Sequence, residues 1–277
     1  LYNRSLLMST MRELGQKQHF TPDDMSQHIQ PETLEKVDLH RDLAEQARDQ
    51  AEIYRGRVYG MFVGSVGLRL NNFSIKYVFK KGAWRPYPQG QNQQLAIRAQ
   101  SNGSYYKSFM VSFVEPWLGG LKPNSLTVSA HYSDETNAYY LWQSGDQHFR
   151  TLGLALGLGR RLNWPDYNFQ RYNEISYQSY NMKDWDYFIR KNGSSNIFAL
   201  TTVLSLSTIG NPYFPRDGSE FSLSVALTQP YSLFDGKDYE DPKLSDRDRY
   251  RFIEYHKWKF KGQWFHPLIN NKSVSYT

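Results

Sequence analysis

The sequence contains no cysteine among its 277 residues. This absence excludes disulfide bonds and cysteine-ligated zinc sites, and it suits an oxidising compartment. No stretch approaches the roughly 18 consecutive apolar residues of a membrane-spanning helix, so a helical membrane protein is excluded. The mean hydropathy is only -0.69. A membrane β-barrel remains possible, because its alternating strands do not raise the average hydropathy.

Motifs for catalysis or metal binding are also scarce. The seven histidines are dispersed, with no pair at metal-ligand spacing. The acidic stretch Asp235–Asp248 lacks the spacing of a calcium-binding EF-hand loop, and we interpret it as an exposed loop. Glu174 is either a lone catalytic carboxylate or a polar residue facing a lumen, and the second interpretation needs fewer assumptions. We therefore expect no catalytic residue, no metal and no cofactor, and hence a protein that is not an enzyme.

The net charge of +6 would fit a nucleic-acid binder or a protein at an anionic surface. The basic residues are scattered along the chain, and no nucleic-acid-binding motif accompanies them. We expect no nucleic-acid partner.

Residues 1–49 differ in kind from the rest. "RSLLMSTMRELG" has helical spacing of its apolar residues, and "TPDDMSQHI" predicts a second helix that begins at the N-cap residue Thr21. "VDLHRDL" predicts a strand. This segment is interpreted as the end of a small α+β module, and because the chain begins inside it, we expect a mature or partial product.

Residues 50–277 are dominated by alternation of apolar with polar or small residues. The pattern predicts about ten strands of roughly ten residues each, a length that suits spanning a membrane. "KSVSYT" near the end predicts the beginning of a further strand.

The clearest of these strands is "TLGLALGLG", residues 151–159. Successive side chains of a strand point to opposite faces. One face of this strand is therefore all leucine, and the other carries only Gly153, Ala155, Gly157 and Gly159. We expect the leucines to face lipid and the small residues to form a lumen-facing wall, against which a bulky group packs inside a barrel.

Alternation alone does not distinguish a soluble β-sandwich from a membrane barrel. The connections favour the barrel, since links on one side, such as "NWPDY", are short, whereas the link after Gln229 is long and charged. One long link on the short side carries Lys76, Lys80, Lys81 and Arg85 among aromatic residues, which suits an interface with anionic headgroups.

Several stretches resemble the BamA family of outer-membrane protein assembly factors. "SFVEPWLGG", "KPNSLTVS" and "STIGNPYFPRDGSEFSLS" resemble its turn-and-strand signatures. "LYNRSLLMSTMRELGQKQHFTPDDM" resembles the end of the last periplasmic POTRA module, and "GMFVGSVGLRLNNFSIK" with "GAWRPYP" resembles the Bacteroidetes members. The resemblance extends over nearly the whole chain in the family's order.

The resemblance implies a transmembrane antiparallel β-barrel of about 16 strands, of which residues 50–277 form the first part. It implies an outer-membrane location with the N-terminal module in the periplasm. The implied partners are unfolded β-barrel clients, accessory subunits of the assembly complex, and outer-membrane lipid or lipopolysaccharide.

It further implies a lateral gate, in which the edge of the first barrel strand templates client strands through its backbone. The gate strand comprises Gln50, Ala51, Glu52, Ile53, Tyr54, Arg55, Gly56, Arg57, Val58, Tyr59 and Gly60. Its charged residues are expected to face a lumen or an interface. Two alternatives stay open: a passive porin or transport barrel, and a soluble carbohydrate-binding β-sandwich, which the 16% aromatic content also permits.

Overall fold

The structure is a computed structural model. It describes residues 26–31, 37–42, 49–58, 61–120, 122, 124–138, 145–187, 191–209, 217–239, 241, 243–269 and 272–276. The chain divides into two compact units: the first comprises Leu1–Gln50 and Leu70–Asn92, and the second comprises Ala51–Arg69 and Gln93–Thr277. The boundary expected between residues 49 and 50 stays a prediction.

The first unit contains a two-stranded antiparallel sheet. Its strands are β1 (Ser26–Pro31) and β2 (Val37–Asp42). The strand predicted for "VDLHRDL" corresponds to β2. The helix predicted from Thr21 is wrong for residues 26–31, because "SQHIQP" has no apolar stripe at helical spacing and its backbone forms a ladder with β2 instead. The helix predicted for "RSLLMSTMRELG" lies outside the described residues.

The first unit also contains a folded connection that follows strand β4 (Met61–Phe73) and includes the 3-10 helix η2 (Ile75–Tyr77). The Ser74 amide donates to the Pro88 carbonyl at 3.0 Å, and the Ser74 hydroxyl donates to the Gln91 side chain at 3.0 Å. The Tyr87 hydroxyl donates to Asp49. The pKa of Tyr87 is raised well above its ordinary value, mainly by partial burial and to a smaller extent by this hydrogen bond to a carboxylate.

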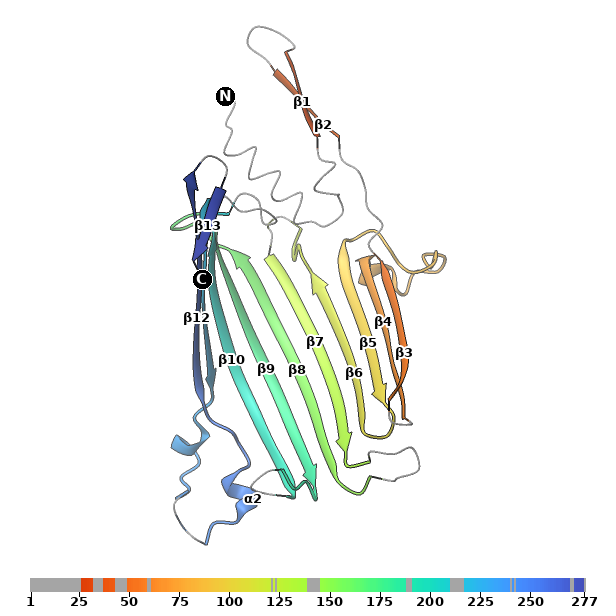
Figure 1. The fold of residues 1–277 in the computed structure, drawn as a ribbon, viewed down its shortest axis with the longest axis vertical. Helices are drawn as coiled ribbons and strands as arrows, with labels where there is room; N and C mark the ends of the chain where they lie inside the picture. Colours follow the sequence, from red (N-terminus) through yellow and green to blue (C-terminus); the bar gives the residue numbers. More distant parts are fainter. Residues whose placement is uncertain are drawn as a thin grey trace. The chain divides into compact units, whose positions relative to one another are not determined.

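An eleven-stranded antiparallel sheet contains most of the remaining chain (Figure 1). Every strand is hydrogen-bonded to its neighbours in sequence, in the order β13-β12-β11-β10-β9-β8-β7-β6-β5-β4-β3. The strands are β3 (Gln50–Val58), β4 (Met61–Phe73), β5 (Gln93–Asn102), β6 (Tyr106–Glu115), β7 (Asn124–Thr136), β8 (His148–Arg161), β9 (Phe169–Lys183), β10 (Gly193–Ser207), β11 (Gly218–Thr228), β12 (His256–Ile269) and β13 (Lys272–Tyr276).

This order confirms the predicted all-β antiparallel architecture, including the further strand at "KSVSYT", which is β13. Within the described residues the sheet is not closed, and β3 and β13 form its two edges. The alternative of a β-sandwich is wrong, because a sandwich needs two sheets packed face to face, and the alternating strands all belong to one sheet.

The strand registers separate the sheet into an apolar and a polar face. Residues that pair directly across neighbouring strands lie on the same face. One row on the apolar face runs through Val128, Leu156, Ile175, Leu200 and Leu227. The next row, on the polar face, runs through Thr127, Gly157, Glu174, Thr201, Ala226 and Lys257.

The connections differ between the two ends of this sheet. We call the end with the β6–β7 and β8–β9 connections the turn end, and the end with the β7–β8 and β11–β12 connections the loop end (Figure 1). The β11–β12 connection contains the 3-10 helix η3 (Tyr231–Leu233) and the short helix α2 (Asp246–Arg249). The described residues include no helix that is long and apolar enough to cross a membrane.

The β11–β12 connection folds back against β10. The pairing of β10 with β11 ends at Ala199 and Thr228, although β10 begins six residues earlier at Gly193. Beside this part of β10, which β11 does not reach, the Asn196 amide donates to the Arg251 carbonyl at 2.8 Å, and the Ile253 amide donates to the Asn196 carbonyl at 3.0 Å. The connection thus provides partners for backbone groups that β11 leaves unpaired.

Candidate functional site

The first candidate site is the edge strand β3. Its hydrogen-bonding neighbour in the sheet is β4, and no described strand pairs with its other edge. The structure places the predicted gate residues Gln50–Val58 in this strand. The remaining two, Tyr59 and Gly60, lie outside the described residues. β3 therefore has a row of backbone amide and carbonyl groups available to another strand.

The side chains of β3 are strongly exposed on both faces of the sheet. Ile53 is 80% exposed and Tyr54 is 66% exposed. A Cβ atom on Gly67 of β4 would lie 3.7 Å from the Glu52 side chain, so Glu52 lies on the same face as Gly67. Strand alternation places Arg55 on the opposite face. The charges of this strand therefore do not all point to one side.

The second candidate site is the predicted small-residue wall of β8. The four leucines Leu152, Leu154, Leu156 and Leu158 are between 44% and 49% exposed. On the opposite face Gly153 and Gly157 are buried, and Ala155 and Gly159 are half-buried. The two faces of β8 are therefore as different in the structure as they are in the sequence.

Side chains from the neighbouring strands cover the small face of β8. A Cβ atom on Gly153 would lie 1.9 Å from the His131 ring of β7, and one on Gly157 would lie 2.0 Å from the Tyr172 hydroxyl of β9. The corresponding distance from Gly159 to the Ser125 hydroxyl is 2.3 Å. Real Cβ atoms essentially never come this close, so a side chain at any of these three positions would force the facing side chain to move. The groups that pack against the predicted small-residue wall therefore come from the neighbouring strands β7 and β9.

Glu174 belongs to this same face. It pairs directly across from Gly157, and its carboxylate accepts a hydrogen bond from the Tyr172 hydroxyl at 2.8 Å. Tyr172 therefore connects the glycine wall to the carboxylate, in an arrangement that positions both side chains. The described residues contain no group of three or more His, Cys, Asp or Glu that could hold a metal ion.

The comparison with protein families identifies the chain. A family model described as the Omp85 superfamily domain matches residues 89–277. The chain belongs to the Omp85 superfamily. This result confirms the family resemblance and the outer-membrane β-barrel class. The match begins after β3, so the gate strand and the POTRA and Bacteroidetes resemblances stay predictions.

Among solved structures, this Omp85 chain is similar to the crystal structure of BamA from Haemophilus ducreyi lacking POTRA domains 1–3. The TM-score is 0.47 and the sequence identity is 16%. The similarity covers 95% of this chain and 46% of that chain, so the chain spans about half the length of that structure. No curated protein sequence matches the chain.

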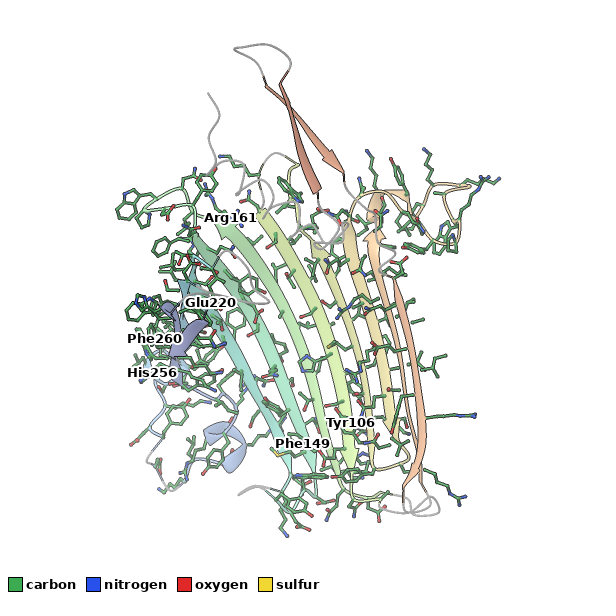
Figure 2. The ribbon with its side chains drawn as sticks, turned by 45° about the horizontal axis from the view of Figure 1, so that its top comes forward. Tyr106, Phe149, Arg161, Glu220, His256 and Phe260 are labelled. Atoms are coloured by element: carbon green, nitrogen blue, oxygen red, sulfur yellow. The ribbon has the colours of Figure 1, made fainter. Side chains whose placement is uncertain are left out.

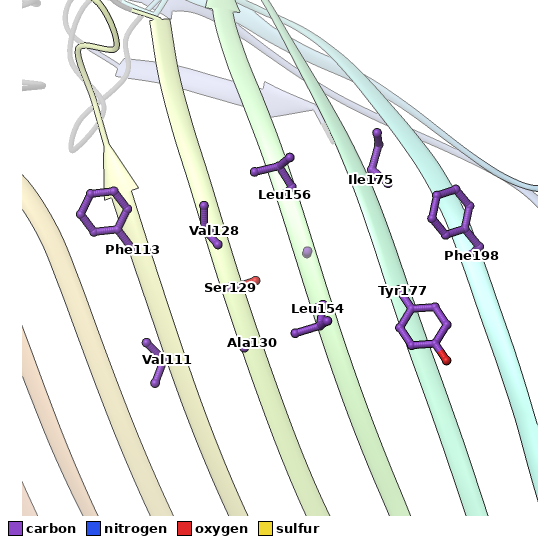
Figure 3. Close-up of a pocket in the computed structure, with 11 residues that line it drawn as sticks. Val111, Phe113, Val128, Ser129, Ala130, Leu154, Leu156, Ile175, Tyr177 and Phe198 are labelled. Carbon is purple, nitrogen blue, oxygen red and sulfur yellow. The ribbon is translucent and has the colours of Figure 1, made fainter. Parts of the chain in front are cut away.

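The apolar face of the Omp85 sheet has a shallow depression over β6–β10 (Figure 3). Ala130 lies directly between Val111 and Leu154 in the register, so a small side chain stands between two larger ones. The lining is almost entirely apolar. A surface of this kind offers mainly hydrocarbon contact.

In the acidic stretch Asp235–Asp248, at the loop end of the Omp85 sheet, carboxylates bind groups of the same stretch. Asp248 lies 3.8 Å from the Lys237 amine, and Asp235 accepts a hydrogen bond from the Tyr239 hydroxyl. That hydrogen bond lowers the pKa of Asp235, and it raises the pKa of Tyr239 to about 12. The carboxylates of this stretch therefore bind other residues of the same loop.

Two features that depend on register were not predicted from the sequence. The first is the pairing of residues 250–253 with β10, and the second is a pair of arginines that face each other across β8 and β9. A period-2 pattern assigns faces within one strand. It does not specify which residue of the next strand lies opposite.

Proposed function

We propose that this chain is part of an outer-membrane protein assembly factor that folds and inserts β-barrel proteins through a lateral gate at β3. The observation that supports this proposal most is the edge position of β3 in a chain of the Omp85 superfamily. The function belongs to the backbone of Gln50–Gly60 rather than to any side chain. No bound cofactor takes part, and the protein is not an enzyme.

The physical basis of the proposal is the free energy of unpaired backbone groups. In lipid, each amide or carbonyl without a partner costs several kcal/mol, so an exposed edge binds an incoming strand strongly. An added strand satisfies these groups in a fixed register, with side-chain contacts as the source of discrimination. Among the described strands none occupies the outer edge of β3, where such a strand would add.

The partners proposed for this reaction are unfolded outer-membrane β-barrel clients, accessory subunits of the assembly complex, and outer-membrane lipid or lipopolysaccharide. We place the N-terminal module in the periplasm, where it would deliver clients to the gate. The small-residue wall at Gly153, Ala155, Gly157 and Gly159 would face the lumen, because it lies on the polar face of the sheet.

Disulfide trapping tests the gate directly, since the chain contains no cysteine of its own. Residues 51–57 of the full-length protein are changed one at a time to cysteine, and a client carries one cysteine in its last strand. The assay in cells measures the yield of the mixed disulfide. We expect one β3 position to react best with each client position, and a one-residue shift in the client to shift that optimum by one residue.

Leu154→Cys is the matched control. Leu154 is 48% exposed, but its strand β8 is paired on both sides, so it should react poorly with the client. Equal yields at Leu154 and along β3, or yields without a preferred register, would overturn the proposal. A proline scan of the same residues adds a second readout, because a proline at an amide that points away from β4 removes a donor to the client strand and leaves the β3–β4 hydrogen bonds in place.

A further inference from the structure

Two arginines lie directly opposite each other at the turn end of the sheet. Arg160 near the end of β8 pairs across from Arg171 near the start of β9. Both side chains are exposed. Strand alternation places Arg160 on the face of the β8 leucines, and the register places Arg171 there with it. Figure 2 shows the neighbouring Arg161 at this end of β8 and Phe149 at the other end.

This pair has no counter-charge within its row. Like charges directly opposite each other in a sheet are destabilising. The residues on either side of the pair are neutral: Asn124 on β7 pairs with Arg160, and Leu204 on β10 pairs with Arg171. Among the described ion pairs, none involves either arginine. Asp166, in the adjoining turn, accepts a hydrogen bond from Asn168 at 2.5 Å.

Arg150 on the same strand and face shows the contrast. It lies near the loop end of β8, and its guanidinium is 3.4 Å from the Asp134 carboxylate of β7. The chain thus supplies an acidic partner for the arginine at one end of this face. At the other end it places two arginines together without one.

The surroundings of the pair resemble a membrane interface. On one side of Arg160 the exposed leucines of β8 begin with Leu158, which is 49% exposed. On the other side the β8–β9 turn carries Trp164, which is 83% exposed, and Tyr167, which is 59% exposed. Barrels in membranes place aromatic residues in this way at the boundary between hydrocarbon and headgroups. In a membrane, arginines beside such aromatic residues would be near the lipid phosphates.

We propose that Arg160 and Arg171 bind the phosphate group of an anionic membrane lipid, whose acyl chains lie along the β8 leucines. A guanidinium group donates two parallel hydrogen bonds to phosphate. One phosphate between the two guanidinium groups converts their mutual repulsion into two attractions. The proposal rests on the outer-membrane location of the proposed function but not on the gate, so it can fail while the insertase assignment stands.

Lipid titration of the full-length protein tests this site. Native mass spectrometry in detergent measures binding of phosphatidylglycerol and of zwitterionic phosphatidylcholine to the wild type and to Arg160→Gln and Arg171→Gln. We expect each variant to bind phosphatidylglycerol about tenfold more weakly, the effect of losing one charge-assisted contact. Binding of phosphatidylcholine should change little. Equal phosphatidylglycerol binding by the wild type and both variants would overturn the proposal.

Two matched controls separate this site from a general effect of charge. Arg150→Gln removes a charge from the same strand and face, at an arginine that has Asp134 as its partner. Arg161→Gln removes a charge next to Arg160 in sequence but on the opposite face. Both controls should bind phosphatidylglycerol like the wild type, and a loss as large as that of Arg171→Gln would overturn the proposal.

Thermal unfolding gives a further test, because anionic lipid should change which protein, the wild type or Arg171→Gln, has the higher unfolding temperature. In detergent without anionic lipid, Arg171→Gln should unfold at the same temperature as the wild type or higher, because a repulsive pair is removed. With phosphatidylglycerol present, the wild type should gain stability and the variant should not. If inorganic phosphate at the same concentration protects the wild type as well as phosphatidylglycerol does, the site binds a soluble anion, and the lipid assignment is wrong.

Discussion

The hydroxyl oxygen of Tyr172 lies only 2.0 Å from the point at which a Cβ atom on Gly157 would stand. The Tyr172 side chain therefore occupies the space that any other residue at position 157 would need. Its hydroxyl then reaches Glu174 at 2.8 Å. An aromatic ring placed over a strand glycine covers backbone that the glycine would otherwise leave bare.

Gly157→Ala should therefore destabilise the folded sheet. The added methyl group forces Tyr172 out of position, and overpacking of this kind costs about 1–3 kcal/mol. The measurement is the temperature at which the folded form disappears on a semi-native gel. Gly64→Ala in β4 is the control, because its Cβ would lie 3.5 Å from the Tyr54 carbonyl oxygen, an ordinary contact. Tyr172→Ser should restore much of the loss in the double variant, and additive losses would contradict this explanation.

The strands of the large sheet were predictable because their signal is local. Apolar residues alternate with polar or small residues within each strand, and in "TLGLALGLG" this alternation defines both faces without reference to any other part of the chain. Short turns rich in proline and glycine mark where the strands end. These features were sufficient to predict an antiparallel sheet of about ten strands.

The features that sequence reasoning missed depend on pairing between segments. The sequence around Gly157 does not predict that Tyr172 packs against it, and the segment "GRR" does not predict that Arg171 lies opposite Arg160. The error at β1 has the same origin. Capping residues near Thr21 suggested a helix, but the ladder between Ser26–Pro31 and Val37–Asp42 determines the structure of that segment.

Ile253→Pro should release the β11–β12 connection from β10. The Ile253 amide donates to the Asn196 carbonyl at 3.0 Å, and proline has no amide hydrogen to donate. We expect limited proteolysis to cleave the 229–255 connection faster, while the sheet stays folded. Ile253→Ala is the control, since it keeps the amide hydrogen and should be cleaved like the wild type. Equal cleavage of both variants would show that the hydrogen bond does not hold the connection.

The loop between β9 and β10 should open in acid. Hydrogen bonds from Lys191, at 2.6 Å, and from Gln147 hold the pKa of Asp186 below its ordinary 3.8, and the pKa of Lys191 is raised above 10.5. The contribution of Asp186 is thus complete above pH 3.8 and is lost as the pH falls through its lower folded pKa. The contribution of Lys191 is complete below pH 10.5 and is lost as the pH rises through its higher folded pKa.

The amide of Trp185, which donates to the Lys191 carbonyl at 2.9 Å, reports on this loop. Its protection from hydrogen exchange, corrected for the intrinsic effect of pH, should decrease at acidic pH below 3.8. Asp186→Asn should make this protection independent of pH in the same range. Because both side chains of the pair are exposed to solvent, the effect should be small and should weaken in high salt. Undiminished acid sensitivity in the variant would assign the transition to another group.

The β4–β5 connection should insert Phe79 into an anionic membrane surface. Phe79 is 96% exposed, and the bond from the Trp84 indole to the Val78 carbonyl, at 3.0 Å, constrains the backbone beside it. Lys80 and Lys81 follow directly and would meet anionic headgroups, each contributing about 1 kcal/mol.

A polarity-sensitive dye on Phe79→Cys tests this insertion, with the full-length protein in lipid nanodiscs. Its emission should shift to the blue with anionic lipid, and less so with zwitterionic lipid or after Lys80→Gln and Lys81→Gln, because the basic residues supply the attraction. High salt should narrow the difference between the two lipids. The control is Phe234→Cys, at a position that is 76% exposed in the β11–β12 connection, which should respond equally to both lipids. The same response from both labels would show that exposure alone, and not the basic residues beside Phe79, determines the contact with lipid.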